Sequence, residues 1–202
     1  MSQVVDDLLT RIRHEFGPNW QARYRDDAPL LAQLNMALER VGAILQRRSV
    51  PIHQKWENIE LEAGQASCPL PEGFLSTVGL FAGSRQIEQV RAEELQKIRQ
   101  AAPLRYWAVR WPDFEVAAPP SAKTEITLAY WPVLPKLSKS DPTPWGGRLD
   151  TVLVRYAAAL LKNVDEFDLG QDLALNQEME ELIMRQLVGI SPRVKRGKGW
   201  LR

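Results

Sequence analysis

Residues 37–63 read ALERVGAILQRRSVPIHQKWENIELEA, and the pattern of the chain changes within them. Up to Leu45 the apolar residues recur every three or four positions, as they do along one face of a helix. Pro51 prevents a helix from continuing. Beyond it Ile59 and Leu61 alternate with glutamates, which is the pattern of a half-buried strand. The stretch therefore predicts that a helical part of the chain gives way to a strand-rich part.

Two helices are predicted before this point. The first presents one apolar face and stops at Gly17 and Pro18; that face comprises Val4, Val5, Leu8, Leu9, Ile12 and Phe16. The second begins near Asp27, a suitable N-cap residue, and has Pro29 in its first turn. Its buried stripe comprises Leu30, Leu34, Ala37, Leu38, Val41, Ile44 and Leu45, and it ends at Arg47, Arg48 and Ser49.

Residues 55–134 are predicted to form mainly short strands. Besides Ile59 and Leu61, two further runs alternate with period two: Trp107, Val109 and Trp111, and then Thr124, Ile126, Leu128 and Tyr130. One interruption, Arg91 to Gln100, predicts a short helix before Pro103.

Helices return after a Pro-, Ser-, Lys- and Gly-rich stretch, residues 135–147, which predicts a loop. The side chain of Trp145 in this loop is expected either to pack into the core or to make an exposed contact. The first closing helix carries Leu149, Val152, Leu153, Tyr156, Leu160 and Val164, and Ala157 to Ala159 allow another helix to approach it closely. Asp168 caps the second, which carries Leu175, Met179, Leu182, Ile183 and Leu187 and ends at Gly189 before Pro192.

The order of elements predicts an α+β fold. We expect a mainly α-helical bundle of about four helices with an inserted small β subdomain and an extended C-terminal tail. The expected divisions are bundle helices in 1–50, a strand-rich subdomain with one short helix in 51–134, a Pro-rich loop in 135–147, bundle helices in 148–190, and a flexible basic tail in 191–202.

Composition narrows the class of protein. The chain has 202 residues, 26 basic against 25 acidic, and a net charge of +1, so it is not a protein that wraps nucleic acid over its whole surface. Cys68 is the single cysteine and is interpreted as a small buried hydrophobe rather than a reactive thiol. No secretory signal is recognised, and no apolar run approaches the ~18 residues of a membrane span. A cytoplasmic site of synthesis is expected.

The last ten residues form a basic tail that ends in an aromatic residue. Five of the ten are basic and none is acidic, and two glycines loosen the backbone. Alone in water such a peptide is not expected to fold, but it can become ordered on an acidic partner. Docking is the favoured reading; a solvated tail and a nucleic-acid contact remain alternatives. The residues expected to bind a partner are Arg193, Val194, Lys195, Arg196, Lys198, Trp200, Leu201 and Arg202.

Catalytic patterns are not recognised, so we expect a protein that is not an enzyme and that has neither cofactor nor metal. His14 and His53 have no second ligand at metal-binding spacing. Three acid pairs are interpreted as solvated helix faces, because neighbouring residues on a helix point about 100° apart: Glu93 and Glu94, Asp165 and Glu166, and Glu180 and Glu181. The tryptophans of the strand-rich part are interpreted as core and protein-contact residues rather than a platform for single-stranded nucleic acid.

Three stretches, taken in order, resemble a known family. The first is the opening pair of helices leading to Trp56 and the acidic strand from Glu57 to Leu61. The second is Cys68-Pro69-Leu70-Pro71-Glu72-Gly73-Phe74-Leu75, and the third is Leu149 through Val188, with its alanine-rich middle and acidic turn. Together they are similar to the head-to-tail adaptors of short-tailed bacteriophages, also called tail accessory or head-completion proteins. The Pro-rich stretch from Pro132 to Pro144 departs from the family pattern.

The resemblance implies a structural virion protein at the neck, the head-to-tail junction, assembled in the host cytoplasm. It implies a homo-oligomeric ring, a dodecamer, on the portal protein, which extends the DNA channel and offers a platform to a tail or nozzle protein. The C-terminal tail would be the portal-binding segment. Packaged DNA would pass through the channel without sequence-specific binding.

Other readings remain open at this stage. A different neck or tail-completion protein would differ only in the partner it meets. A virion-associated cell-wall hydrolase would need two distant carboxylates across a cleft, and a DNA-binding or packaging factor would need a basic stripe on the folded body.

Overall fold

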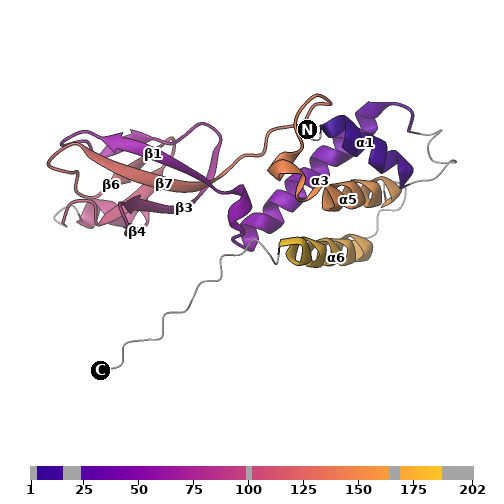
Figure 1. Cartoon of the computed structure of the whole chain (residues 1–202). Coiled ribbons are helices and arrows are strands. Elements are labelled where there is room, and N and C mark those ends of the chain that lie inside the picture. The colour runs from indigo at the N-terminus through magenta and orange to yellow at the C-terminus, as the bar shows by residue number, and fades with distance from the viewer. Residues whose placement is uncertain (1–3, 16–23, 99–101, 164–168, 188–202) are drawn as a thin grey trace, which may run out of the picture. The chain divides into compact units, whose positions relative to one another are not determined.

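The computed structural model of the chain describes residues 4–15, 24–98, 102–163 and 169–187 (Figure 1). They divide into two compact units. One unit is built from the described parts of Met1–Ile52 and Pro135–Arg202, and the other is His53–Leu134.

The first unit is helical. It contains α1 (Val5–His14), α3 (Asp27–Arg47), α5 (Asp150–Asn163) and α6 (Leu169–Leu187), and the short 3-10 helix η3 (Pro144–Gly147) precedes α5. A second 3-10 helix, η1 (Pro51–His53), spans the boundary between the two units. In Figure 1, α5 lies beside α1 and α3, and these three helices pack on one another. The α6 helix packs on α5. The predicted apolar stripes are buried between them, including Leu8, Leu34, Leu38, Leu153, Tyr156, Met179 and Ile183.

The Pro-rich loop completes the start of α1. The N–H groups of Val5 and Asp6 donate to the carbonyl oxygens of Asp141 and Lys139, at 3.0 and 3.1 Å. A helix leaves its first N–H groups without partners inside the helix, so the loop supplies the acceptors that a capping side chain usually provides. The amide of Asn35 on α3 donates to the carbonyl of Leu137 and accepts from its N–H, which fastens the loop to a second helix.

The second unit is a seven-stranded sheet with the strand order β1-β7-β3-β4-β5-β6-β2. Its strands are β1 (Lys55–Leu61), β2 (Ser67–Pro69), β3 (Phe74–Ala82), β4 (Arg85–Gln89), β5 (Tyr106–Arg110), β6 (Asp113–Val116) and β7 (Thr124–Pro132). All neighbouring pairs are antiparallel except β4 and β5, which are parallel. Figure 1 shows β7 lying between β1 and β3.

Both faces of the sheet are partly covered. Ile126, Leu128 and Tyr130 on β7 join a core with Trp107 and Phe114, as the alternation predicts. On a second apolar cluster, Leu95 of the short helix α4 (Ala92–Leu95) packs against Ala108 and Ala117. The 3-10 helix η2 (Gln96–Ile98) follows, so the helix predicted from Arg91 to Gln100 is present as these two short helices; its last two residues lie outside the described ranges.

The prediction of a mainly α-helical four-helix bundle is wrong. Residues 53–134 form a compact unit of their own, with a seven-stranded sheet and an independent core, and five α-helices are described in the chain. The error has a physical cause. Each short strand is weak evidence alone, and the pairing of β1 with β7 joins residues about 70 positions apart, which local periodicity does not reveal.

Two local predictions also need correction. Asp27 is the first residue of α3 rather than its N-cap; the N-cap is Asp26, whose side chain makes no capping hydrogen bond. Trp111 does not continue the buried row of Trp107, since β5 ends at Arg110 and Trp111 is 72% exposed while Trp107 is fully buried.

Candidate assembly surfaces

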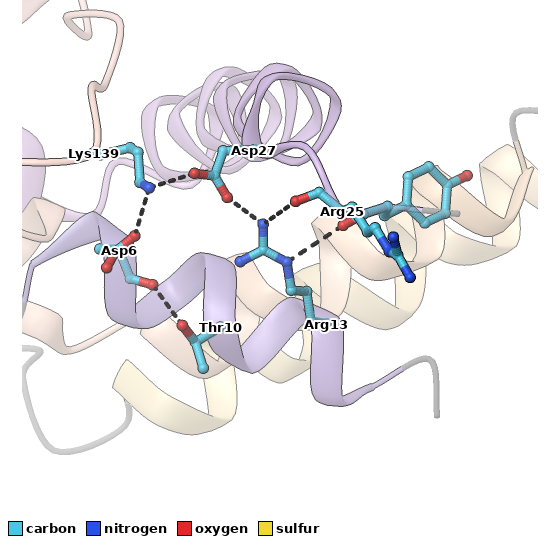
Figure 2. Close-up of polar contacts among 7 residues, drawn as sticks. Asp6, Thr10, Arg13, Arg25, Asp27 and Lys139 are labelled. Carbon is cyan, nitrogen blue, oxygen red and sulfur yellow. Dashed lines mark hydrogen bonds and ion pairs between the residues drawn. The ribbon is translucent and has the colours of Figure 1, made fainter. Parts of the chain in front are cut away.

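An ion-pair network joins the Pro-rich loop to the starts of two helices. Lys139 of the loop pairs with Asp27 of α3 and, at 3.3 Å, with Asp6 of α1. The guanidinium of Arg13 on α1 pairs with Asp27 from the other side and also donates to the carbonyls of Tyr24 and Arg25 (Figure 2). No local sequence pattern connects these residues. The spacing of Ser138 and Asp141 is a turn signal, and the Asp141 carboxylate accepts from the Ser138 N–H at 2.7 Å.

The network shifts the pKa values of Asp27 and Lys139. The hydrogen bond from Lys139, followed by that from Arg13, lowers the pKa of Asp27 below its ordinary 3.8. The same contact with Asp27, followed by the contact with Asp6, raises the pKa of Lys139. Both shifts favour the charged forms of Asp27 and Lys139 near neutral pH, so the network holds the backbone in place rather than transferring protons.

Asp150 is a buried carboxylate at the start of α5. It is 3% exposed, and among the described residues neither carboxylate oxygen has a hydrogen-bond donor. The nearest cation is Arg11 of α1, at 3.9 Å, whose other nitrogen donates to Thr151. Burial raises the pKa of Asp150, Arg11 opposes that shift, and Asp7 adds to it. Asp150 thus links α5 to α1 through its charge interaction with Arg11, without a hydrogen bond.

A groove of about 890 Å³ runs between α3 and α6. Its apolar lining includes Ile44, Leu173 and Met184, and the last two are exposed. Across it, Glu180 of α6 pairs with both Arg47 and Arg48 at the end of α3. The predicted acid pair Glu180 and Glu181 is therefore divided, because Glu181 pairs instead with Arg185 on its own helix, at 3.0 Å. A groove of this form suits an amphipathic segment better than a small polar substrate.

The strand-rich unit exposes four large apolar side chains: Trp56, Leu75, Trp111 and Val133. Trp111 lies against Phe74, with ring centroids 6.5 Å apart, and Phe74 precedes Leu75. The Val133 N–H donates to the carbonyl of Gly73, so three of the four gather around one end of β3. Exposed aromatic residues of this kind are enriched where proteins bind one another.

The other residues considered for catalysis or metal binding lie apart from one another. His14 is exposed at the end of α1, whereas His53 is half-buried beside Trp131, and its Nε2 lies 3.2 Å from the Pro132 carbonyl. Burial lowers the pKa of His53 and raises that of Cys68, which packs against the sheet core from β2. Glu93 is exposed, and the Glu94 carboxylate accepts from the Arg91 N–H at 3.4 Å at the start of α4. Asp165 and Glu166 are outside the described residues.

Within the described ranges, no group of three or more His, Cys, Asp or Glu side chains is placed to hold a metal ion. Among the same residues, no helix has the length and apolarity to cross a membrane. The predicted partner-binding tail, Arg193 to Arg202, lies outside the described residues, as do the predicted helix cap Asp168 and the stop signals Gly189 and Pro192. Trp145 is half-buried, between the two alternatives predicted for it.

A family model described as SU10 adaptor protein matches residues 5–196, which spans both units. The chain belongs to the SU10 adaptor family. The match confirms the resemblance to phage head-to-tail adaptors. No curated protein matches the adaptor.

Membership of the SU10 adaptor family indicates the general function of the chain. The adaptor is a structural component of a bacteriophage virion that contacts other capsid or tail components. The surfaces available for such contacts on the described residues include the α3–α6 groove and the exposed apolar side chains around β3.

Proposed function

We propose that this adaptor forms a ring, with twelve copies as the expected number, beneath the portal at the neck of the virion. The ring extends the DNA channel and offers its far side to a tail or nozzle protein. The observation that carries the proposal is the family match, which covers nearly the whole chain.

The surface features suit a closed ring. A ring forms by head-to-tail contacts, in which each copy uses one surface to bind a different surface of the next. The α3–α6 groove and the exposed set of Leu75, Trp111 and Val133 are unlike one another. Two unlike surfaces are what a head-to-tail contact requires, whereas a two-fold dimer would use one surface twice.

The contact to the portal is assigned to the C-terminal tail, residues 193–202. Its five basic residues supply charge, and Trp200 with Leu201 supplies apolar area. A single tail would bind weakly, but a ring engages many tails at once, so the assembled ring binds far more tightly than one copy. Because the basic residues act by charge, binding should weaken as salt rises.

The test is to remove residues 193–202 and measure binding to the purified portal. We expect binding to fall by at least tenfold, which corresponds to about 1.4 kcal/mol. The matched control keeps the length of the chain and replaces the five basic residues with serine, which isolates the charge. Full portal binding by the shortened chain would remove the tail from the mechanism.

A further inference from the structure

The sheet has two edges, and the β2 edge is poorly suited to a further strand. It is three residues long. The Ala66 carbonyl accepts from an N–H of β6, so by alternation Ser67 and Pro69 face outward. Pro69 has no N–H, and the Ser67 carbonyl already accepts from the Gln65 side-chain amide at 3.0 Å. A proline and an occupied carbonyl are features that protect an edge from pairing.

The β1 edge is longer, with seven residues, no proline and five exposed positions. The loop between β3 and β4 shows which of its backbone groups face outward. That loop has two residues, so the flanking Ala82 and Arg85 form hydrogen bonds with each other. Alternation then turns the backbone groups of Phe81 toward β7, where Phe81 lies opposite Thr127.

Alternation along β7 then determines the orientation of β1. The residues on either side of Thr127 face β1, so Trp56, Asn58 and Glu60 turn their N–H and C=O groups away from β7. A contact just after the strand agrees with this, because the N–H and the carbonyl of Glu62 bond to Gln65 rather than to β7. Three alternate residues of β1 therefore direct their backbone groups to the side on which a strand can be added.

One end of this edge is acidic. Glu60 lies directly opposite Glu125 on β7, and Glu62 follows two residues later. Lys123 pairs with Glu60 at 2.8 Å and with Glu62 at 3.5 Å. Three carboxylates thus gather beside one lysine. Like charges directly opposite one another in a sheet are unfavourable, so a cation on an added strand would be stabilising at this end.

The other end of the edge is aromatic. Trp56 is 59% exposed and stacks on Phe81, with ring centroids 5.3 Å apart. A Cβ at Gly79 would lie 3.1 Å from the Phe81 ring, so the absence of a side chain there leaves the space that this ring occupies. Trp56 and Glu60 are four residues apart in one strand and share a face of the sheet. An added strand would meet the aromatic ring and the carboxylates on that same face.

These features favour a separate protein over a second copy of the adaptor. The β2 edge of a second copy is poorly suited to pairing, so a sheet cannot readily continue head-to-tail from β1 of one copy to β2 of the next. Pairing of β1 with β1 would be a two-fold contact, whereas a closed ring uses head-to-tail contacts. Charge complementarity points to an occupant that is extended and basic.

We propose that the β1 edge binds an extended, basic segment of another protein of the neck, which adds to the sheet as an antiparallel strand. The segment carries a basic residue opposite Glu60 and an apolar residue opposite Trp56. Main-chain hydrogen bonds hold such a strand, and its alternate side chains give specificity. The inference rests on the proposed function for the source of the segment, and deepens it by giving the chemistry of one partner.

The test uses two peptides that differ only in charge. The probe is acetyl-RSKVTVLS-amide, whose lysine lies opposite Glu60 and whose leucine lies opposite Trp56 in an antiparallel alignment. The control is acetyl-ESEVTVLS-amide. Each is titrated to several millimolar into the full-length protein while the N–H chemical shifts of Trp56, Asn58 and Glu60 are followed. We expect the basic peptide to shift these amides and to bind about tenfold more tightly, because two charge pairs change from repulsive to attractive.

Two further comparisons separate strand pairing from charge attraction. The peptide acetyl-RSKVPVLS-amide lacks the N–H that faces Asn58 and should lose binding, although its charge is unchanged. In the protein, Glu60→Lys should reverse the preference between the basic and the acidic peptide. Glu93→Lys is the matched control, since Glu93 is exposed on α4 of the same unit, and it should leave the preference as it is.

Several results would overturn the proposal. They are no shift of the three amides by either charged peptide, equal binding of the two, and undiminished binding of the proline peptide. Hydrogen exchange of the same amides in the free protein adds two more. Slow exchange in the monomer would mean that the chain itself covers the edge, and slow exchange that appears only at high protein concentration would mean that a second copy does.

Sedimentation with the purified portal tells the two proposals apart. A ring that forms on the portal while the basic peptide fails to bind would overturn the β1 inference and leave the proposed function standing. Selective binding of the basic peptide without any association with the portal would do the reverse, because the edge would accept a basic strand in a protein that does not sit beneath the portal.

Discussion

Charged side chains in this adaptor are used mainly to fix the backbone. Lys139 joins the Pro-rich loop to α1 and α3, and Glu180 holds the end of α3 beside α6. Exposed pairs contribute little to stability singly, but these are networks with a shared central residue. Their effect is on where the loop and helix ends lie.

Asp27→Asn should lower the free energy of unfolding near pH 7, because Lys139 and Arg13 lose their shared partner. The folded pKa of Asp27 is depressed, so its contribution is present above 3.8, its ordinary value, and is lost as pH falls below that through the folded pKa. The difference from wild type should therefore shrink in acid. Denaturant unfolding at several pH values measures it. Asp26→Asn is the control, and an equal loss from both variants would contradict the network's role.

Trp107 and Trp111 should respond oppositely to truncation. Trp107→Ala empties a fully buried site in the sheet core and should cost about 3–5 kcal/mol. Trp111→Ala removes a side chain that is mostly in solvent and should change stability by less than about 0.5 kcal/mol. Thermal unfolding of the two variants checks this. A large loss from Trp111→Ala would mean that its contact with Phe74 supports the core.

At the scale of elements, local pattern predicted what each segment is but not what it pairs with. The apolar faces of α1, α3 and α5 follow from spacing, and so do the buried positions of β7. The register of β1 on β7 depends on residues about 70 positions apart, and the loop that completes α1 lies about 135 positions from it. In neither case does the local sequence indicate which segment is the partner. The groove could not be predicted from the sequence either. Its acidic residues and arginines can be identified there, but the groove that they border exists only once α3 and α6 take their positions in the fold.

The α5 helix should not tolerate bulk on its packed side. Ala157 is fully buried, in the helix that packs on α1, α3 and α6. Ala157→Leu should cost about 1–3 kcal/mol by overpacking. Ala159→Leu, at a half-buried position of the same helix, should cost less. Equal effects in chemical denaturation would mean that close helix approach at Ala157 is unimportant.

At the scale of the whole molecule, a helical unit and a sheet unit make up one phage adaptor. Each unit has its own core, so stability and assembly can be tested separately. The unlike exposed surfaces are the proposed contacts between copies, and the basic tail is the proposed contact with the portal.

The most direct test of the ring proposal is the mass of the purified protein by analytical ultracentrifugation, alone and mixed with the portal. The account predicts a monomer alone at low micromolar concentration. With the portal it predicts a larger complex that saturates at one adaptor per portal subunit. A chain that never sediments with the portal would contradict the account and direct attention to the tail proteins as its partners.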